Sequence, residues 1–371
     1  MTMDEQENKV MLLIQNRDRL FIPCVPEKVT LELSRKGAPG TLKFSVLQDD
    51  QLKMEEGNVV QMCYGKTNLF KGFIFRRVED EDGKVSVVAY DQLRYLKNKG
   101  IYSVVNKTAS YLITQIADDF KLVHKKQTKD SSGNMSEQEA ICDTQYRIPK
   151  MRASNETLFD IIQKALDHTL LYDQSQNNTK MYVLYDDFGV LTLKEVSQLD
   201  VPILIDAQTA QGFSFESSID QDTYNQIILY EDNGDEGARV AGAVKDSANI
   251  ARWGVLQKIE SVNSRKVQNP QAKAEQMLKQ FNAAKKSLKI KAAFGDVRVR
   301  AGSRIWIQLK VHDPDLNLGG KPDKNDGDGD TSDKKDSSST VVQLLVENVK
   351  HTFEAGGYTM DLTLVGRGLT A

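Results

Sequence analysis

Residues 57–97, GNVVQMCYGKTNLFKGFIFRRVEDEDGKVSVVAYDQLRYLK, decide the fold class of this chain. Apolar and polar residues alternate along the stretch, as they do in β-strands. Turn residues interrupt the alternation at 65–68 and 81–83, where Gly and Asn tolerate the backbone angles of a tight reversal. The pattern predicts a β-meander that ends in a short charged helix. The stretch holds no catalytic motif, which favours a structural part over an enzyme.

The preceding residues continue the β pattern. Residues 10–48 alternate with period two and are interrupted by prolines and Gly40, which is typical of short antiparallel strands in a sandwich or barrel. We therefore predict a first β domain at residues 1–100.

The middle of the chain has the period of helices. Apolar residues recur at the spacing of one helix face in two segments, and Ser154-Asn155 offers a cap to the second. We predict a small α+β middle domain at 101–205, with helices at 112–120 and 158–166, a polar loop at 125–140 and a hairpin at 180–193.

Strand patterns return in the last part of the chain, which we predict to be a second β domain at 206–371. It contains a helical insertion at about 240–285, where Pro270 suits the first turn of a helix. Residues 313–340 are rich in Gly, Asp, Ser and Lys, so we expect a disordered surface loop there. The predicted strands are 213–215, 225–230, 287–293, 304–311, 341–349 and 358–365.

A weak internal repeat links the two ends of the chain. Residues 57–90 and 302–365 share the order Gly, strand, loop, strand, acidic-Gly turn, strand. Any two three-stranded meanders could share this order, so the pattern alone leaves duplication and coincidence open. With duplication, the fold is mainly β: two similar antiparallel β-barrels and a small α+β middle domain.

Composition excludes several classes of protein. Lys plus Arg number 49 against 52 for Asp plus Glu in 371 residues, so neither nucleic-acid recognition nor a polybasic membrane anchor is expected. No segment has the roughly 20 consecutive apolar residues of a membrane span, and residues 1–9 lack the features of a secretory signal. If the protein acts outside the cell that made it, we expect it to leave by lysis or inside a larger particle. Cys24, Cys63 and Cys142 are expected to be reduced thiols.

We predict no catalytic, cofactor or metal site, and hence no enzyme. Asp326, Asp328 and Asp330 alternate like calcium ligands, but Thr331 stands where an EF-hand needs Gly. The acid pairs at 79–82 and 186–187 lie at predicted hairpin tips, where acids are ordinary turn residues. The histidines at 124, 168, 312 and 351 are dispersed and show no zinc or triad spacing, so we expect most of them at the surface or in hairpins.

Aromatic and arginine residues are instead candidates for protein contacts, because both are common interface anchors. Trp253, beside Arg252, fits such an anchor and equally fits a seal between the second β domain and the following helix. The candidate interface residues are Phe70, Phe73, Phe75, Arg94, Tyr95, Arg252, Trp253 and Trp306.

Several short motifs resemble one family. They are FKG at 70–72, VED at 78–80, GK at 83–84, AYDQLRYLKN at 89–98 and WGVLQ at 253–257. Together they resemble the XkdQ-like hub family, the baseplate hub proteins of contractile phage tails, defective prophages and diffocin-like R-type bacteriocins. The likeness runs from about residue 10 to 366, and the element at 90–96 is its most specific part.

The resemblance implies a structural role. Hubs of this family are trimers with two tube-like barrels per chain, so that six barrels adapt a sixfold tail tube to a threefold spike. The implied partners are further copies of the chain, the tail tube protein, the central spike protein, and a baseplate wedge or LysM-containing tail protein. Two alternatives stay open: a cell-wall-binding or peptidoglycan-degrading tail-tip protein, and a related secretion-system spike component.

Overall fold

The computed structural model describes residues 9–25, 27–47, 54–129, 135–175, 180–220, 223–232, 237–262, 269–309, 341–355 and 357–365. The chain divides into two compact units, which we call the sheet unit (Met1–Phe213, Lys289–His312 and Asn317–Leu364) and the insertion unit, chiefly Ser214–Leu288. This division is coarser than the three predicted domains, whose boundaries stay predictions. The predicted loop at 313–340 lies outside the described residues.

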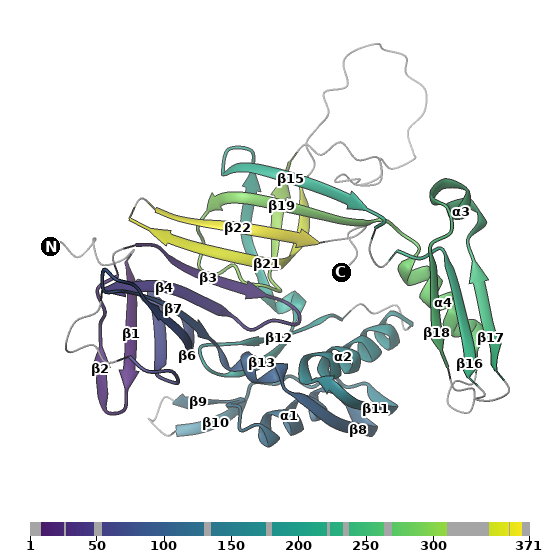
Figure 1. Ribbon diagram of the computed structural model, residues 1–371, viewed down its shortest axis with the longest axis horizontal. Coiled ribbons are helices and arrows are strands. Elements are labelled where there is room, and N and C mark those ends of the chain that lie inside the picture. Colours follow the sequence, from purple (N-terminus) through teal and green to yellow (C-terminus); the bar gives the residue numbers. More distant parts are fainter. Residues whose placement is uncertain are drawn as a thin grey trace, which may run out of the picture. The chain divides into compact units, whose positions relative to one another are not determined.

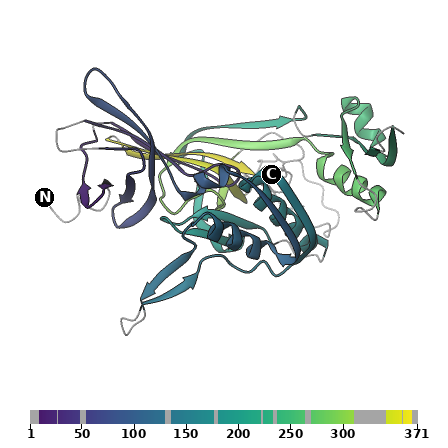
Figure 2. The same ribbon diagram turned by 60° about the horizontal axis from the view of Figure 1, so that its bottom comes forward.

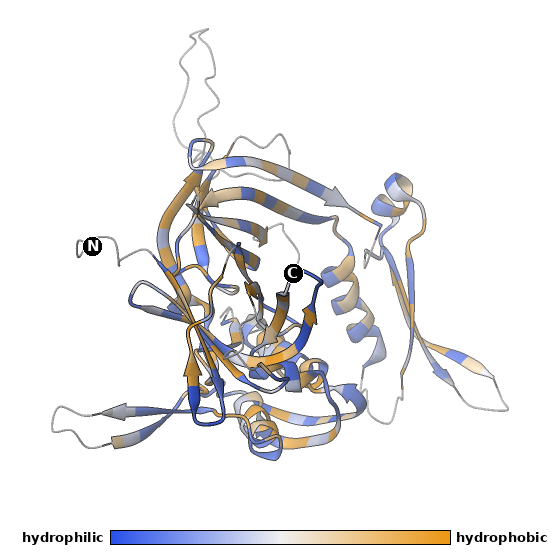
Figure 3. Cartoon of the chain, turned by 60° about the vertical axis from the view of Figure 1, so that its left-hand side comes forward, coloured by the Kyte–Doolittle hydropathy of each residue, from blue (hydrophilic) through white to orange (hydrophobic). Residues whose placement is uncertain are grey.

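The sheet unit confirms a mainly β fold, because its centre is a single sheet of 13 strands. Apolar and polar residues alternate along its strands, as the hydropathy colours of Figure 3 show. The apolar side chains of the N-terminal strands pack in one core. The N-terminal strands are β1 (Val10–Asn16), β2 (Arg19–Phe21), β3 (Val29–Ser34), β4 (Thr41–Leu47), β5 (Val59–Tyr64), β6 (Thr67–Glu79) and β7 (Lys84–Tyr90).

The remaining strands of the sheet repeat the order of the first ones. In the first half-sheet the order is β3-β4-β7-β6-β5, and in the second it is β15-β19-β22-β21-β20. This correspondence supports the predicted duplication, and β6 and β21 are both 13 residues long. The strands of the second half-sheet are β14 (Asp200–Asp206), β15 (Ala210–Ser218), β19 (Lys285–Phe294), β20 (Arg304–Gln308), β21 (Val342–Glu354) and β22 (Gly357–Val365).

The two half-sheets are joined by β3, an edge strand of the first, and β21, an inner strand of the second, which lie side by side in Figure 1. These strands pair antiparallel, from Ser34 opposite Asn348 to Val29 opposite Phe353. Within the described residues no ladder closes either half into a barrel. The outer strands of the second half, β14 and β15, are nevertheless consecutive in the chain.

The middle region follows β7 and has its own apolar core. The predicted helices and hairpin are confirmed. The predicted polar loop at 125–140 is instead largely a hairpin. The cap of the second helix is Thr157, whose hydroxyl accepts from the Asp160 amide, and not Ser154-Asn155. The elements are η2 (Gln92–Lys97), β8 (Lys99–Thr108), α1 (Ala109–Asp119), β9 (Lys125–Lys129), β10 (Met135–Glu139), β11 (Arg147–Thr157), α2 (Leu158–Ser175), β12 (Tyr182–Asp186), β13 (Leu191–Glu195) and η3 (Val196–Leu199).

The insertion unit lies in sequence between β15 and β19, two strands that correspond to the β3–β4 hairpin. The predicted helical insertion at about 240–285 contains two helices, one of which begins at Pro270 as predicted. The unit as a whole is α+β, because its helices accompany a three-stranded sheet in the order β17-β16-β18. The strand at 238–245 was not predicted, because its Gly and Ala residues carry little β propensity. The elements are β16 (Gln226–Asp232), β17 (Ala238–Lys245), α3 (Ser247–Trp253), β18 (Gln257–Ser261) and α4 (Pro270–Phe281).

Candidate functional site at the junction of the half-sheets

The residues between β19 and β20, 295–303, connect three parts of the sheet unit, and we call them the junction loop. Val297 packs against the core of the first half-sheet. Gly302 has φ +93°, and a Cβ there would lie 2.7 Å from a methyl of Val183 in β12. The Gly302 amide also donates to the carbonyl of Val346 in β21, at 2.8 Å. The loop thus packs against both half-sheets and the middle region.

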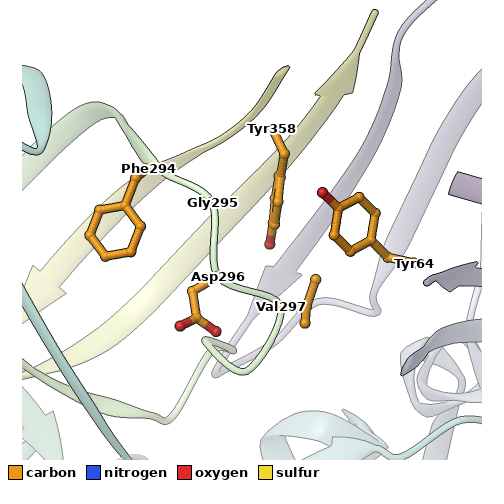
Figure 4. Close-up of a pocket in the computed structure, with 6 residues that line it drawn as sticks. All are labelled: Tyr64, Phe294, Gly295, Asp296, Val297 and Tyr358. Carbon is orange, nitrogen blue, oxygen red and sulfur yellow. The ribbon is translucent and has the colours of Figure 1, made fainter. Parts of the chain in front are cut away.

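A pocket of about 470 Å³ opens beside the start of the junction loop. Figure 4 shows the rings of Tyr64 and Tyr358 beside each other among the residues that line it, with ring centroids 5.2 Å apart and ring planes inclined by 55°. A Cβ on Gly295 would lie 2.2 Å from the Tyr358 ring, so only glycine leaves room for this ring. The Asp296 carboxylate at the pocket accepts from the Arg298 guanidinium, at 2.6 Å, and is therefore already neutralised.

Two histidines expected at the surface or in hairpins are buried. His351 Nδ1 lies 2.8 Å from the Tyr358 hydroxyl, and burial lowers the pKa of His351 to about 4. His124 contacts Glu139 and Asp118, each at 2.9 Å. Burial alone would lower the pKa of His124, but these two hydrogen-bonded carboxylates outweigh burial and raise it. His351 is thus neutral at pH 7, while His124 favours its charged form.

A buried charge cluster lies on the other side of the junction loop. The Arg300 guanidinium stacks 3.7 Å from the Tyr185 ring centroid, donates to the Asp186 carbonyl at 2.8 Å, and lies 3.8 Å from the Asp187 carboxylate. Asp91 caps η2 and accepts from the amides of Gly40, at 2.8 Å, and Leu93, at 3.0 Å. Because Arg300 belongs to the second half-sheet and Asp91 follows the first, the cluster links the two.

Burial raises the pKa values of the acids in this cluster. It raises the pKa of Asp186 to about 6, although hydrogen bonds from Gly189 and Gln92 act to lower it. Burial, with the nearby charge of Asp186, also raises the pKa of Asp91 well above its usual range. Asp186 Oδ2 and Arg300 Nε are buried without a hydrogen-bond partner. Asp186 is therefore not the ordinary solvated turn acid that the sequence predicted.

Four of the predicted interface residues lie together. The Tyr95 ring contacts Phe73 at 6.3 Å and Phe75 at 6.1 Å between centroids, and the Arg94 guanidinium lies 5.4 Å from the Phe75 centroid. All four side chains are half-buried. Phe70 is different, because it is buried in the core of the first half-sheet and has no surface to offer.

The other three candidates lie elsewhere. Trp306 is 42% exposed and faces Leu204, itself 40% exposed, across the β14–β20 ladder. Arg252 stacks on Trp253 at 5.6 Å, and α3 buries none of its own residues. Trp306 therefore forms an apolar surface with Leu204, and both interpretations of Trp253 stay open.

No group of three or more His, Cys, Asp or Glu side chains in the described part of the chain could hold a metal ion. The helices that the structure describes are too short or too polar to cross a membrane. The thiols of Cys24, Cys63 and Cys142 are free. The candidate calcium ligands at 326–330 and His312 lie outside the described residues.

Comparison with known proteins decides the family. A family model described as YQBQ-like matches residues 29–365. The chain belongs to the YQBQ-like family. It is 30% identical over 301 residues to the phage-like element PBSX protein XkdQ of Bacillus subtilis, covering 79% of this chain and 86% of XkdQ. It is 28% identical to YqbQ of the same organism, covering 78% and 84%. The resemblance predicted from the sequence is confirmed.

Solved structures show the same fold at low identity. A tail protein from Neisseria meningitidis matches with a TM-score of 0.61 over 97% of this chain and 98% of its own, and the 43 kDa tail protein of prophage MuSo2 from Shewanella oneidensis with 0.58 over 96% and 97%. Both are 10% identical to the YQBQ-like chain. The chain thus shares the fold of these two tail proteins, and its relative XkdQ is a protein of a phage-like element.

Proposed function

We propose that this YQBQ-like chain is the structural, non-enzymatic hub of a contractile tail baseplate, and that it works as a homotrimer. The observation that carries the proposal is the strand order repeated in one chain. Three chains with two equivalent half-sheets each supply six similar elements, which is what an adaptor between a threefold spike and a sixfold tube requires. The junction loop contributes to this role, because its contacts fix the position of one half-sheet relative to the other.

The proposed partners are the tail tube protein, the central spike protein, and a baseplate wedge or LysM-containing tail protein. Assembly in the bacterial cytoplasm and release by lysis belong to the same proposal. The half-buried group of Phe73, Phe75, Arg94 and Tyr95 and the exposed pair of Leu204 and Trp306 are the surfaces that we assign to contacts with other subunits, since aromatic and Arg side chains are common anchors.

Light scattering after size-exclusion chromatography tests the proposal. We expect a particle of three times the chain mass of 41.6 kDa, alone or together with the tube or spike protein. A strict monomer that binds neither protein would contradict it. Clearing of purified peptidoglycan by the chain would instead favour the tail-tip enzyme, and a sheath gene beside the chain's own gene would favour a tail over a secretion-system spike.

A further inference from the structure

The hairpin of β9 and β10 is the least buried β element of the sheet unit. All five residues of β10 are exposed, and Met135 is 64% exposed. Figure 2 shows the hairpin extending away from the rest of the middle region. Two-stranded hairpins are only marginally stable in water. A projecting hairpin of this kind is a candidate for pairing with another chain.

Both outer edges of the hairpin are open within the described residues, because β9 and β10 pair only with each other. Open strand edges present unpaired amides and carbonyls, which accept a further strand from another protein. Neither strand carries a proline, and β-bulges are absent from the ladder between them. The usual devices that block edge pairing are therefore missing, apart from charge.

The charges of the two strands are opposite. In β9, KKQTK, every charged residue is basic, and in β10, MSEQE, every charged residue is acidic. The strands already attract each other: Lys125 lies 3.9 Å from Glu137, and Gln127 donates to Glu137 at 2.8 Å. A second β10 on the open edge of β9 would meet the same basic residues, and opposite charges across strands stabilise pairing.

The base of the hairpin is held rigidly. His124 bonds Glu139 of β10 and Asp118 of α1, and Lys126 forms an ion pair with Asp187 next to β12. These contacts attach the hairpin to the middle region, so its direction is determined by the fold. A pre-oriented strand loses less entropy on binding than a flexible one.

We infer that β9 of one copy pairs with β10 of the next, head to tail, in the proposed trimer. A strand pair of this kind is heterologous, and a threefold axis along the strands closes it into a ring in which all neighbours are antiparallel. Three hairpins then form six strands without an open edge. This inference rests on the proposed homotrimer and adds the surface that joins its subunits. Strands this short provide few hydrogen bonds, so they add to a larger interface.

Disulfide cross-linking of mixed full-length chains tests the inference. One chain carries Gln127→Cys in β9, the other Glu137→Cys in β10, and both carry Cys24→Ser to remove the exposed native thiol. Gln127 and Glu137 are opposite each other within the hairpin, and the same register is expected between copies. After co-expression and oxidation we expect disulfide-linked dimers from the mixture, and none from either chain alone.

A control chain with Gln257→Cys places an exposed thiol in the insertion unit, and it should give no cross-link with Glu137→Cys. A trimer that forms no cross-link in the mixture would overturn the hairpin contact while leaving the hub proposal intact. Cross-links in either chain alone would also overturn it, because they would require β9 to pair with β9, or β10 with β10, of the neighbouring copy. A strict monomer, with or without tube and spike proteins, would contradict both proposals.

Discussion

The two half-sheets share one strand order and differ in what fills the connections. In the first, β3 and β4 are joined by a short turn and β5 and β6 by Gly65-Lys66. In the second, the equivalent of the first connection holds the insertion unit, and the equivalent of the second runs from Gln308 to Val342. The flanking strand also differs, because β1 is antiparallel to β5 whereas β14 is parallel to β20. The sheet framework is thus kept, and the loops have diverged.

The cores differ as well. The first half-sheet is built on apolar side chains such as Ile14, Leu42 and Ile74. The second adds two ionisable groups, the partly buried Arg300 and the buried His351. Buried charge also lies where the two halves meet, since Arg35, directly after β3, is 8% exposed and pairs with Glu347 of β21 at 2.5 Å. The cores of the halves thus differ, while the junction between them is held partly by ion pairs.

The largest expected effect comes from Arg300→Ala. This change removes the hydrogen bond to the Asp186 carbonyl, the ion pair with Asp187 and the positive charge near the buried carboxyls of Asp186 and Asp91. Removing one member of a buried charge pair typically costs about 3–5 kcal/mol. Denaturant unfolding should show the loss. Arg152→Ala in β11 is the matched control, since Arg152 is exposed and its removal should change stability little. Equal losses in the two variants would show that the Arg300 cluster does not hold the halves together.

Truncation of core side chains tests whether the two half-sheets unfold as one cooperative unit. Ile74 in the first half and Ile305 in the second are 1% and 0% exposed, and Ile→Ala in a core costs about 2–5 kcal/mol. Because β3 and β21 join the halves into one sheet, we expect each variant to reduce hydrogen-exchange protection in both halves. Loss confined to the mutated half would mean that the halves are independent.

Gly295→Ala addresses the junction loop with a smaller change. The new methyl would lie 2.2 Å from the Tyr358 ring, and overpacking of this kind costs about 1–3 kcal/mol. Gly212→Ala is the control, because nothing lies within 4 Å of a Cβ at that position. Thermal unfolding of both proteins is the measurement, and a Gly295→Ala protein as stable as the control would mean that the loop shifts freely.

The smallest expected effect is a change in how steeply the free energy of unfolding depends on pH. Asp186 has a pKa of about 6 in the fold against an ordinary value of 3.8, so between these values the folded state binds more protons than the unfolded state. The free energy of unfolding contributed by this group therefore falls as pH rises from about 3.8 to about 6. Asp186→Asn should flatten that fall, as followed by urea unfolding at each pH. An unchanged slope would place the titration elsewhere, with Asp91 the first candidate.

The sequence predicts the strands better than the junction. Alternation in segments such as Val85, Val87 and Ala89 marks strands because their apolar side chains face one core. The hairpin of β9 and β10 lacks apolar alternation, and β17 is rich in Gly and Ala, so both were missed. The burial of Asp91, Asp186 and Arg300 depends on three segments far apart in the chain, and no local pattern reports it. Phe70 was misplaced because strand periodicity alone does not say which face is the core.

Electron microscopy of an assembled particle can locate the chain and count its copies. For a hub we expect three copies of this chain at the end of the tail tube, with their six half-sheets arranged around the tube axis in a ring. Finding the chain on the sheath or the capsid, or in a copy number other than three at the tube end, would contradict the hub proposal.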